Sequence, residues 1–258
     1  MDDVELERYS RHVLLPEIDI AGQERLSEAA VLIVGAGGLG SPAAMYLASS
    51  GIGKITVCDD DTVDLGNLQR QILYRTDDIG KYKAAAAAAA LHAINPLVDV
   101  RPAGTRLTES AMQAVVRDHD VVVDASDNFE TRFALNTACY AECTPLVSGA
   151  AIGFRGQVSV FRLDRDGGPC LQCLYPAAPS DQETGNCSAN GVFAPLTGII
   201  GSILAAETIK LLTGFGAGLD ERLLLFDAAS MTFRCSDLSR DPACPVCSNA
   251  RRVLTTGA

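Results

Sequence analysis

The chain has 258 residues, 48% of them hydrophobic, which is enough for one α/β domain with a sizeable core. It carries 21 lysines and arginines against 32 aspartates and glutamates, and its net charge of -11 disfavours binding to nucleic acid or to an anionic membrane face. The first residues are acidic and contain no apolar run, so we expect neither a secretory nor a transit peptide, and we expect a cytoplasmic location.

The first 150 residues alternate between apolar strands and helical segments. A continuous apolar run that stops at a glycine, as at residues 30–34, is typical of a strand buried on both faces of a parallel sheet. The alternation predicts a Rossmann-like, doubly wound α/β fold. The expected strands are residues 30–34, 54–58, 97–101, 120–124 and 145–148, and the clearest helices are residues 38–50 and 83–93.

The pattern changes after residue 150. Residues 156–162 and 222–226 predict antiparallel strands that extend the mostly parallel sheet. The longest apolar stretch, residues 192–206, is too short and too interrupted by proline and glycine to cross a bilayer, so we expect a buried helix there. The whole chain, residues 1–258, is expected to be a single domain with a nucleotide-binding half (1–150) and a second half (151–258).

A glycine-rich loop joins the first strand to the first helix of the sheet. Its glycines are Gly35, Gly37, Gly38 and Gly40. Such a loop directs free backbone N–H groups and the positive end of a helix toward phosphate. Asp59 ends the next strand, where a carboxylate accepts hydrogen bonds from ribose hydroxyls. Both features fit NAD as well as ATP, so an NAD-dependent dehydrogenase remains an alternative at this point.

Polar residues that follow Asp59 favour a triphosphate over a dinucleotide. Asn67, Arg70, Gln71 and Lys83 offer amides and two cations, which suit the charge that gathers on a leaving pyrophosphate. The alternative is an exposed polar segment with ordinary surface lysine and arginine side chains.

Asp127 lies just past the strand at residues 120–124, at the carboxyl edge where doubly wound sheets bind ligands. A carboxylate at this position can hold Mg²⁺ together with phosphate oxygens. The alternative is that Asp127 caps the following helix, because Ser126 and Asn128 beside it are also good caps.

Two Cys-x-x-Cys pairs predict a structural zinc site. Their members are Cys170, Cys173, Cys244 and Cys247. This spacing lets two thiolates of each pair reach one tetrahedral Zn²⁺, and a closed four-cysteine site would fasten the C-terminal part of the chain. Two redox-active pairs are the alternative. Four other cysteines are expected to pack in the core: Cys58, Cys139, Cys143 and Cys235.

Cys187 lies in a segment rich in proline, serine, glycine and asparagine, residues 176–191, which predicts a mobile loop. An accessible thiol on such a loop can attack an activated acyl group or a persulfide. An inert thiol is the equally weighted alternative.

Taken together, these motifs resemble the ThiF, MoeB and HesA family, the bacterial relatives of ubiquitin-activating enzymes, over nearly the whole chain. The matching segments are residues 8–11, 35–40, 59, 67–71, 83, 126–128 and 148–150 and both cysteine pairs. The resemblance implies ATP- and Mg²⁺-dependent adenylation of the C-terminal glycine of a small ubiquitin-like sulfur carrier, with release of pyrophosphate. The attacking carboxylate is already ionised at neutral pH, so no catalytic base is required.

The resemblance also implies roles for single residues. The counterpart of Asp59 binds ribose, those of Asn67, Arg70 and Lys83 hold the phosphates, and that of Asp127 binds magnesium. Arg11 is similar to an arginine that reaches into the site of the neighbouring subunit, which implies a homodimer.

Within the family, residues 59–61, 71–73, 153–157 and 174–176 are more similar to the ThiF group, so a ThiS-like carrier of the thiamine pathway is favoured over a MoaD-like carrier of the molybdenum cofactor pathway. Cys187 then matches a thiol that forms an acyl disulfide with the carrier. No fused rhodanese domain is evident, so a separate sulfur donor protein is expected. A zinc-fastened binding module without catalysis is a further alternative, which intact Arg70, Lys83 and Asp127 disfavour.

Overall fold

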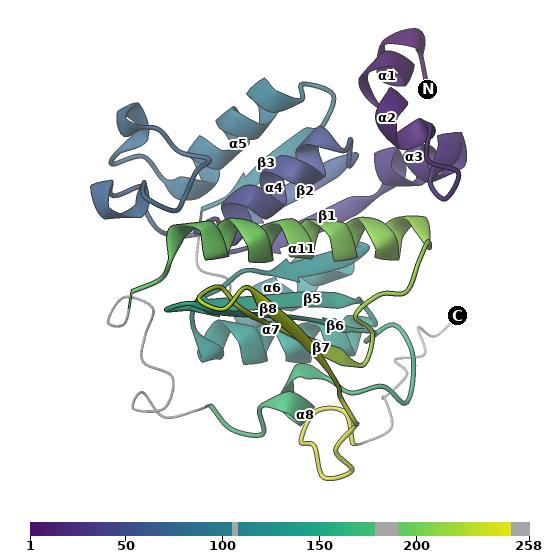
Figure 1. Ribbon diagram of the computed structural model, residues 1–258, viewed down its shortest axis with the longest axis vertical. Helices are drawn as coiled ribbons and strands as arrows, with labels where there is room; N and C mark the ends of the chain where they lie inside the picture. Colours follow the sequence, from purple (N-terminus) through teal and green to yellow (C-terminus); the bar gives the residue numbers. More distant parts are fainter. Residues whose placement is uncertain (105–107, 179–190, 249–258) are drawn as a thin grey trace.

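The computed structural model describes residues 1–104, 108–178 and 191–248. Its centre is one eight-stranded sheet with the order β3-β2-β1-β4-β5-β6-β7-β8 (Figure 1). Strands β3 to β5 in this order run parallel, and β6, β7 and β8 extend the sheet in antiparallel fashion. The predicted mixed α/β fold is therefore confirmed. The strands are β1 (Ala30–Val34), β2 (Lys54–Cys58), β3 (Asp99–Ala103), β4 (Val121–Asp124), β5 (Leu146–Ile152), β6 (Arg155–Phe161), β7 (Arg222–Asp227) and β8 (Thr232–Asp237).

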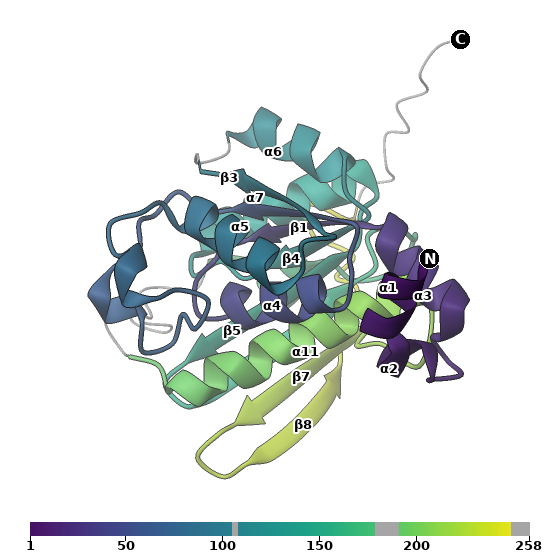
Figure 2. The same ribbon diagram turned by 90° about the horizontal axis from the view of Figure 1, so that it is seen from above.

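Helices cover both faces of the parallel part of the sheet. Helices α4, α5 and α11 lie on one face, and α6 and α7 lie on the other (Figures 1 and 2). Alternate residues of β1 serve the two cores: Val31 and Ile33 pack with α4 and α11, whereas Leu32 and Val34 pack with α6 and α7. The helices are α1 (Asp3–Arg8), α2 (Ser10–Val13), α3 (Asp19–Glu28), α4 (Gly40–Ser49), η1 (Leu65–Asn67), η2 (Thr76–Asp78), α5 (Lys83–Ile94), α6 (Glu109–Arg117), α7 (Phe129–Glu142), α8 (Leu171–Leu174) and α11 (Ala194–Thr213).

Helix α11 is long and apolar enough to cross a membrane by length and composition, but half of its apolar window is buried inside the protein. It packs against α4 so closely that a Cβ on Gly201 would lie 2.5 Å from the carbonyl oxygen of Leu39. A glycine at this position lets the two helix backbones approach each other. Helix α11 thus packs into the fold, as the interrupted apolar stretch predicted.

Some elements differ from the prediction. Strand β3 begins two residues later than expected, because the backbone N–H of Val98 bonds to the carbonyl of Asn95 in a turn before pairing with β2 starts. Strand β5 continues to Ile152, since it pairs with β6 along its full length. Strand β8 was not predicted at all. Every residue of β8 is exposed, and only Phe233 and Cys235 alternate with polar residues, so the local signal is short and weak compared with the pairing to β7.

The prediction for the four core cysteines is half wrong. Cys58 and Cys139 are buried, and burial raises the pKa of Cys58 to about 11. Cys143 and Cys235 are exposed instead. Cys143 ends helix α7 in the left-handed conformation, with φ 57°, and Cys235 lies on the uncovered strand β8.

Candidate functional site

The glycine loop between β1 and α4 is a tight turn without room for side chains. Gly35 has φ +91°, and a Cβ on it would lie 2.6 Å from the carbonyl oxygen of Ala125. A Cβ on Gly40 would lie 1.8 Å from the carbonyl oxygen of Gly35. Only glycine fits at these two positions, and the loop therefore presents bare backbone before the first turn of α4.

Asp59 lies directly against this loop. Its Oδ2 accepts a hydrogen bond of 2.7 Å from the backbone N–H of Ala36, and its Oδ1 accepts one of 3.0 Å from the N–H of Asp61. Burial raises the pKa of Asp59 above its usual range, against the effect of these N–H donors and of Lys83. The structure thus brings the loop and the predicted ribose-binding acid together.

Lys83, the first residue of α5, brings a buried cation to the same place. Its Nζ lies 2.8 Å from Oδ2 of Asp61. The side chain of Lys83 is 6% exposed, whereas that of Asp61 is 70% exposed. A phosphate oxygen that approached Lys83 from solvent would share or replace this carboxylate partner.

The segment around η1 carries three further predicted residues, Asn67, Arg70 and Gln71, of which Arg70 and Gln71 lie beside the loop. Asn67 takes part in the cap of η1, in which its Oδ1 accepts from the N–H of Asp64 at 3.3 Å. Arg70 donates to the carbonyl oxygen of Gly66 at 3.1 Å, and its Cγ lies 3.4 Å from the place of a Cβ on Gly38.

Gln71 carries a buried acceptor that the described part of the chain leaves unsatisfied. The residue is 4% exposed, its Oε1 has no hydrogen-bond partner among the described residues, and its Nε2 lies 3.5 Å from the place of a Cβ on Gly37. A buried polar atom of this kind ordinarily has a partner, so its position beside the loop fits a bound polar ligand such as a nucleotide.

Asp127 is exposed beyond the end of β4. The neighbouring Asn128 caps α7, because its Oδ1 accepts from the N–H of Thr131 at 2.9 Å. Asp127 contacts only the amide of Asn128, at 3.4 Å, among the hydrogen bonds of the described residues. The capping role that was the alternative for Asp127 therefore belongs to Asn128, and Asp127 stays exposed just past the carboxyl end of β4.

A buried ionic network lies beneath this turn, and we did not predict it. Asp124 is fully buried and accepts from the hydroxyl groups of Ser126, at 2.6 Å, and Ser148, at 2.7 Å. Arg132 of α7 lies 3.8 Å from its carboxylate and donates to the carbonyl oxygen of Gly149 at 2.9 Å. This network fastens the end of β4 to β5 and fixes the base of the turn that carries Asp127.

Arg11 lies away from these groups. It is exposed on α2, which precedes the amino end of β1, whereas the loop, Asp59 and Lys83 lie at the carboxyl edge of the sheet. Figures 1 and 2 show the N-terminal helices and the segment between β2 and α5 at opposite ends of the molecule. Within one chain, Arg11 does not join the site.

The four cysteines of the two pairs converge at one point. All four sulfur atoms lie within 4.8 Å of one another, and the closest contacts join Cys170 to Cys244 at 3.5 Å and Cys173 to Cys247 at 3.3 Å. A tetrahedral Zn²⁺ with bonds of about 2.3 Å holds its sulfur ligands about 3.8 Å apart, so the arrangement fits zinc. Asn136 of α7 donates to the sulfur of Cys170 at 3.5 Å, as expected beside a thiolate.

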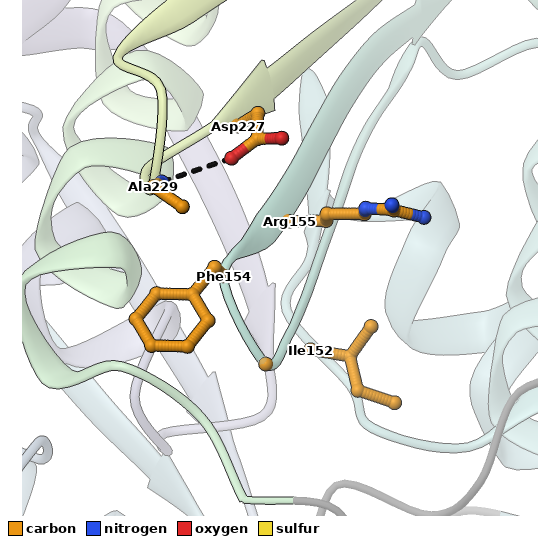
Figure 3. Close-up of a pocket in the computed structure, with 6 residues that line it drawn as sticks. Ile152, Phe154, Arg155, Asp227 and Ala229 are labelled. Carbon is orange, nitrogen blue, oxygen red and sulfur yellow. Dashed lines mark hydrogen bonds between the residues drawn. The ribbon is translucent and has the colours of Figure 1, made fainter.

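Cys187 lies outside the described residues. The turn between β5 and β6 forms an open hollow with the end of β7, lined by Ile152, Phe154, Arg155 and Asp227 (Figure 3). The ring of Phe154 packs on Phe193, with 5.4 Å between the centroids. The hollow lies at the carboxyl end of β5, which belongs to the same edge of the sheet as the glycine loop and Asp59.

The sheet, the bare glycine loop, the acid and the buried lysine together fit a nucleotide-binding α/β enzyme, and the four-cysteine cluster fits a zinc site. The model of the ThiF family matches residues 9–246, and the chain belongs to this family. It is 47% identical over 247 residues to the SAMP-activating enzyme E1 of Haloferax volcanii. The alignment covers 96% of this chain and 90% of that protein. It is 45% identical to the sulfur carrier protein adenylyltransferase of Thermus thermophilus, with 95% and 92% of the two chains covered.

The molybdopterin-synthase adenylyltransferase of Escherichia coli is 43% identical, with 96% of this chain and 98% of that protein covered. Among solved structures, Escherichia coli MccB with ATP has the same fold, with a TM-score of 0.81 over 93% of this chain and 74% of that chain at 24% identity. The two adenylyltransferases at 45% and 43% identity make the chain an adenylyltransferase, an activity that implies ATP rather than NAD as the nucleotide substrate.

Proposed function

We propose that the protein uses ATP to adenylate the C-terminal glycine of a small ubiquitin-like sulfur carrier and releases pyrophosphate. The observation that carries this proposal is the single hydrogen-bonded cluster of the glycine loop, Asp59, Asp61 and Lys83 at the carboxyl edge of the sheet. Relatives at 45% and 47% identity are named for sulfur carrier and SAMP activation, which supports a carrier of this kind.

In the proposed reaction, a carboxylate oxygen of the carrier's glycine attacks the α-phosphorus of ATP. The bond from this phosphorus to the oxygen that bridges the α- and β-phosphates breaks, and its electron pair leaves with pyrophosphate. Asp59 holds the ribose, while Asn67, Arg70 and Lys83 hold the phosphates and neutralise their charge. The glycine loop and Gln71 line the same site. Mg²⁺, when bound through Asp127, would screen the phosphate charge further.

The cysteine clamp has a structural role in this proposal. Cys170, Cys173, Cys244 and Cys247 would hold Zn²⁺ as a closed site with no position for a substrate. The clamp joins α8 to the segment after β8 and supports the second half of the chain (151–258), which we assign to carrier binding.

The assignment of carrier binding rests on exposed phenylalanine side chains near the carboxyl edge of the sheet. Phe154 is 53% exposed and Phe193 is 42% exposed beside the hollow, and Phe233 on β8 is 52% exposed. An apolar surface of this kind suits a partner protein. We propose a ThiS-like carrier, with a MoaD-like carrier as the alternative, a separate sulfur donor protein, and Cys187 as the thiol that bonds to the activated carrier.

The N-terminal helices suit a contact between two copies of the chain. Leu14 and Leu15 after α2, and Ile20 in α3, are between 47% and 69% exposed. Arg11 is exposed on the same segment. We propose a homodimer in which this surface is covered and Arg11 completes the nucleotide site of the partner subunit.

The test supplies the purified protein with ATP, Mg²⁺ and, in separate reactions, a ThiS-like and a MoaD-like carrier that end in Gly-Gly. Mass spectrometry should detect a carrier heavier by one adenylate, and the carrier that reacts identifies the pathway. Absence of an adenylate on both carriers would contradict the proposed function.

The role of Cys187 is tested by Cys187→Ala. This variant should form the same carrier adenylate and should block the later transfer of sulfur. Unchanged sulfur transfer would show that Cys187 is not the thiol that bonds to the carrier.

A further inference from the structure

The hydroxyl group of Tyr74 lies between two parts of the site that are far apart in the sequence. Tyr74 is 6% exposed, between η1 and η2. Its Oη lies 2.8 Å from the carbonyl oxygen of Ala36 in the glycine loop and 3.3 Å from the carbonyl oxygen of Lys83 at the start of α5. A hydroxyl has one proton, so it donates mainly to Ala36.

This hydroxyl closes a ring of hydrogen bonds around the site. The N–H of Ala36 donates to Asp59, whose second oxygen accepts from the N–H of Asp61. The carbonyl of Asp61 accepts from the N–H of Lys83 at 2.8 Å. The carbonyl oxygens of Lys83 and Ala36 both face the hydroxyl of Tyr74. Without this hydroxyl, only the Asp59 side of the ring connects the loop to Lys83.

We propose that Tyr74 is a positioning residue that fixes the glycine loop relative to Lys83, an inference that rests on the proposed binding of ATP at this loop. Ala36 is held from both sides, because Asp59 binds its N–H and Tyr74 binds its carbonyl. Burial raises the pKa of Tyr74, so the hydroxyl keeps its proton and remains a donor. The side chain need not touch the nucleotide, since it acts through the backbone of the two groups that do.

The test compares Tyr74→Phe with Tyr82→Phe in the full-length protein. The first change removes only the hydroxyl and keeps the buried ring, so the fold is retained. The second removes the hydroxyl of an exposed tyrosine in the same segment, 61% exposed, as a matched control. Calorimetric titration with a non-hydrolysable ATP analogue measures binding without any carrier. ATP–pyrophosphate exchange with a carrier gives KM for ATP and kcat.

Loss of one or two hydrogen bonds that position the loop should raise the Kd for the analogue and the KM for ATP about tenfold in Tyr74→Phe, with a smaller change in kcat. Tyr82→Phe should match the unchanged protein. The rise in unfolding temperature that the analogue causes should also shrink in Tyr74→Phe.

Two outcomes would overturn the inference. One is an unchanged Kd and KM in Tyr74→Phe. The other is a lower unfolding temperature without the analogue combined with an unchanged rise on adding it, because this is the result of a merely structural hydroxyl. If the wild-type protein binds the analogue and adenylates a carrier, either outcome leaves the proposed function intact. If the wild-type protein binds no analogue, the proposed function fails, and the inference fails with it.

Discussion

Asp127 presents its carboxylate to solvent at the end of β4, while Asn128 supplies the cap of α7. Asp127→Asn should therefore leave the unfolding free energy within about 0.5 kcal/mol of the unchanged value, as for most surface substitutions. Adenylation should fall by a factor of about 100 or more, because the amide no longer supplies a charged ligand for Mg²⁺. Asp77→Asn, at another exposed position, is the control. Full activity of Asp127→Asn would remove the magnesium assignment.

Arg132 is a residue whose loss should act through stability. Asp124 is fully buried, so Arg132→Met would leave a buried carboxylate without its cation. Breaking a buried pair in this way costs about 3–5 kcal/mol. Denaturant unfolding should show this loss, and Arg234→Met on the exposed strand β8 should change little. A loss below about 1 kcal/mol would mean that Ser126 and Ser148 satisfy Asp124 by themselves.

His119 connects two elements, strand β2 and helix α6. Its Nδ1 donates to the carbonyl oxygen of Val115 at 2.7 Å, since a carbonyl can only accept, and its Nε2 then accepts from the hydroxyl of Thr56 at 2.7 Å. Burial lowers the pKa of His119. Below about pH 6.5, His119 is therefore protonated in the unfolded chain while it stays neutral in the folded chain. The free energy of unfolding should fall as the pH falls through this range.

This pH dependence can be measured by urea unfolding between pH 8 and pH 5.5. The loss of unfolding free energy toward low pH should be smaller in His119→Asn than in the unchanged protein. His92→Asn, at an exposed position of α5, should keep the original slope. Equal slopes in all three proteins would show that His119 is not the group responsible.

Helices and strands with a clear pattern in their own residues could be predicted from the sequence. Those that depend on contacts with residues far along the chain could not. The apolar run of β1 and the alanine-rich α5 have the expected positions within one residue. Strand β8 has only a weak local signal, the alternation of Phe233 and Cys235 with polar residues. Helix α7 lies between these cases: Arg132 and Asn136 fall on the same buried face as Leu135 and Cys139, at helical spacing. A charge on such a face needs a buried partner, but the sequence could not identify Asp124 as that partner.

The same reasoning applies to the candidate site. The glycine loop and Asp59 follow a known strand–turn–helix pattern, and the structure places them together as expected. The bridge from Tyr74 to Ala36 spans 38 residues and depends on the path of the chain through η1 and η2, for which the sequence gives no periodic signal.

At the scale of the whole molecule, the cysteine clamp joins two segments 74 residues apart. Removal of Zn²⁺ by a chelator, or Cys244→Ser, should lower the unfolding temperature by about 10 °C and open the C-terminal segment to proteolysis. Elemental analysis should give one zinc per chain, lost in the variant. Cys235→Ser, at an exposed cysteine outside the clamp, should keep both metal and stability. A metal-free protein with unchanged stability would contradict the structural role.

The proposed dimer predicts that two inactive variants restore each other. If Arg11 serves the partner's site, a mixed dimer of Arg11→Ala and Asp127→Asn chains contains one site with both native residues and one site with neither. Random pairing makes half of the dimers mixed, so coexpressed chains should recover about a quarter of the original adenylation activity, while each variant alone stays inactive. Light scattering should give twice the chain mass. If Arg11 acted within its own chain, every site would lack one residue and no activity would return.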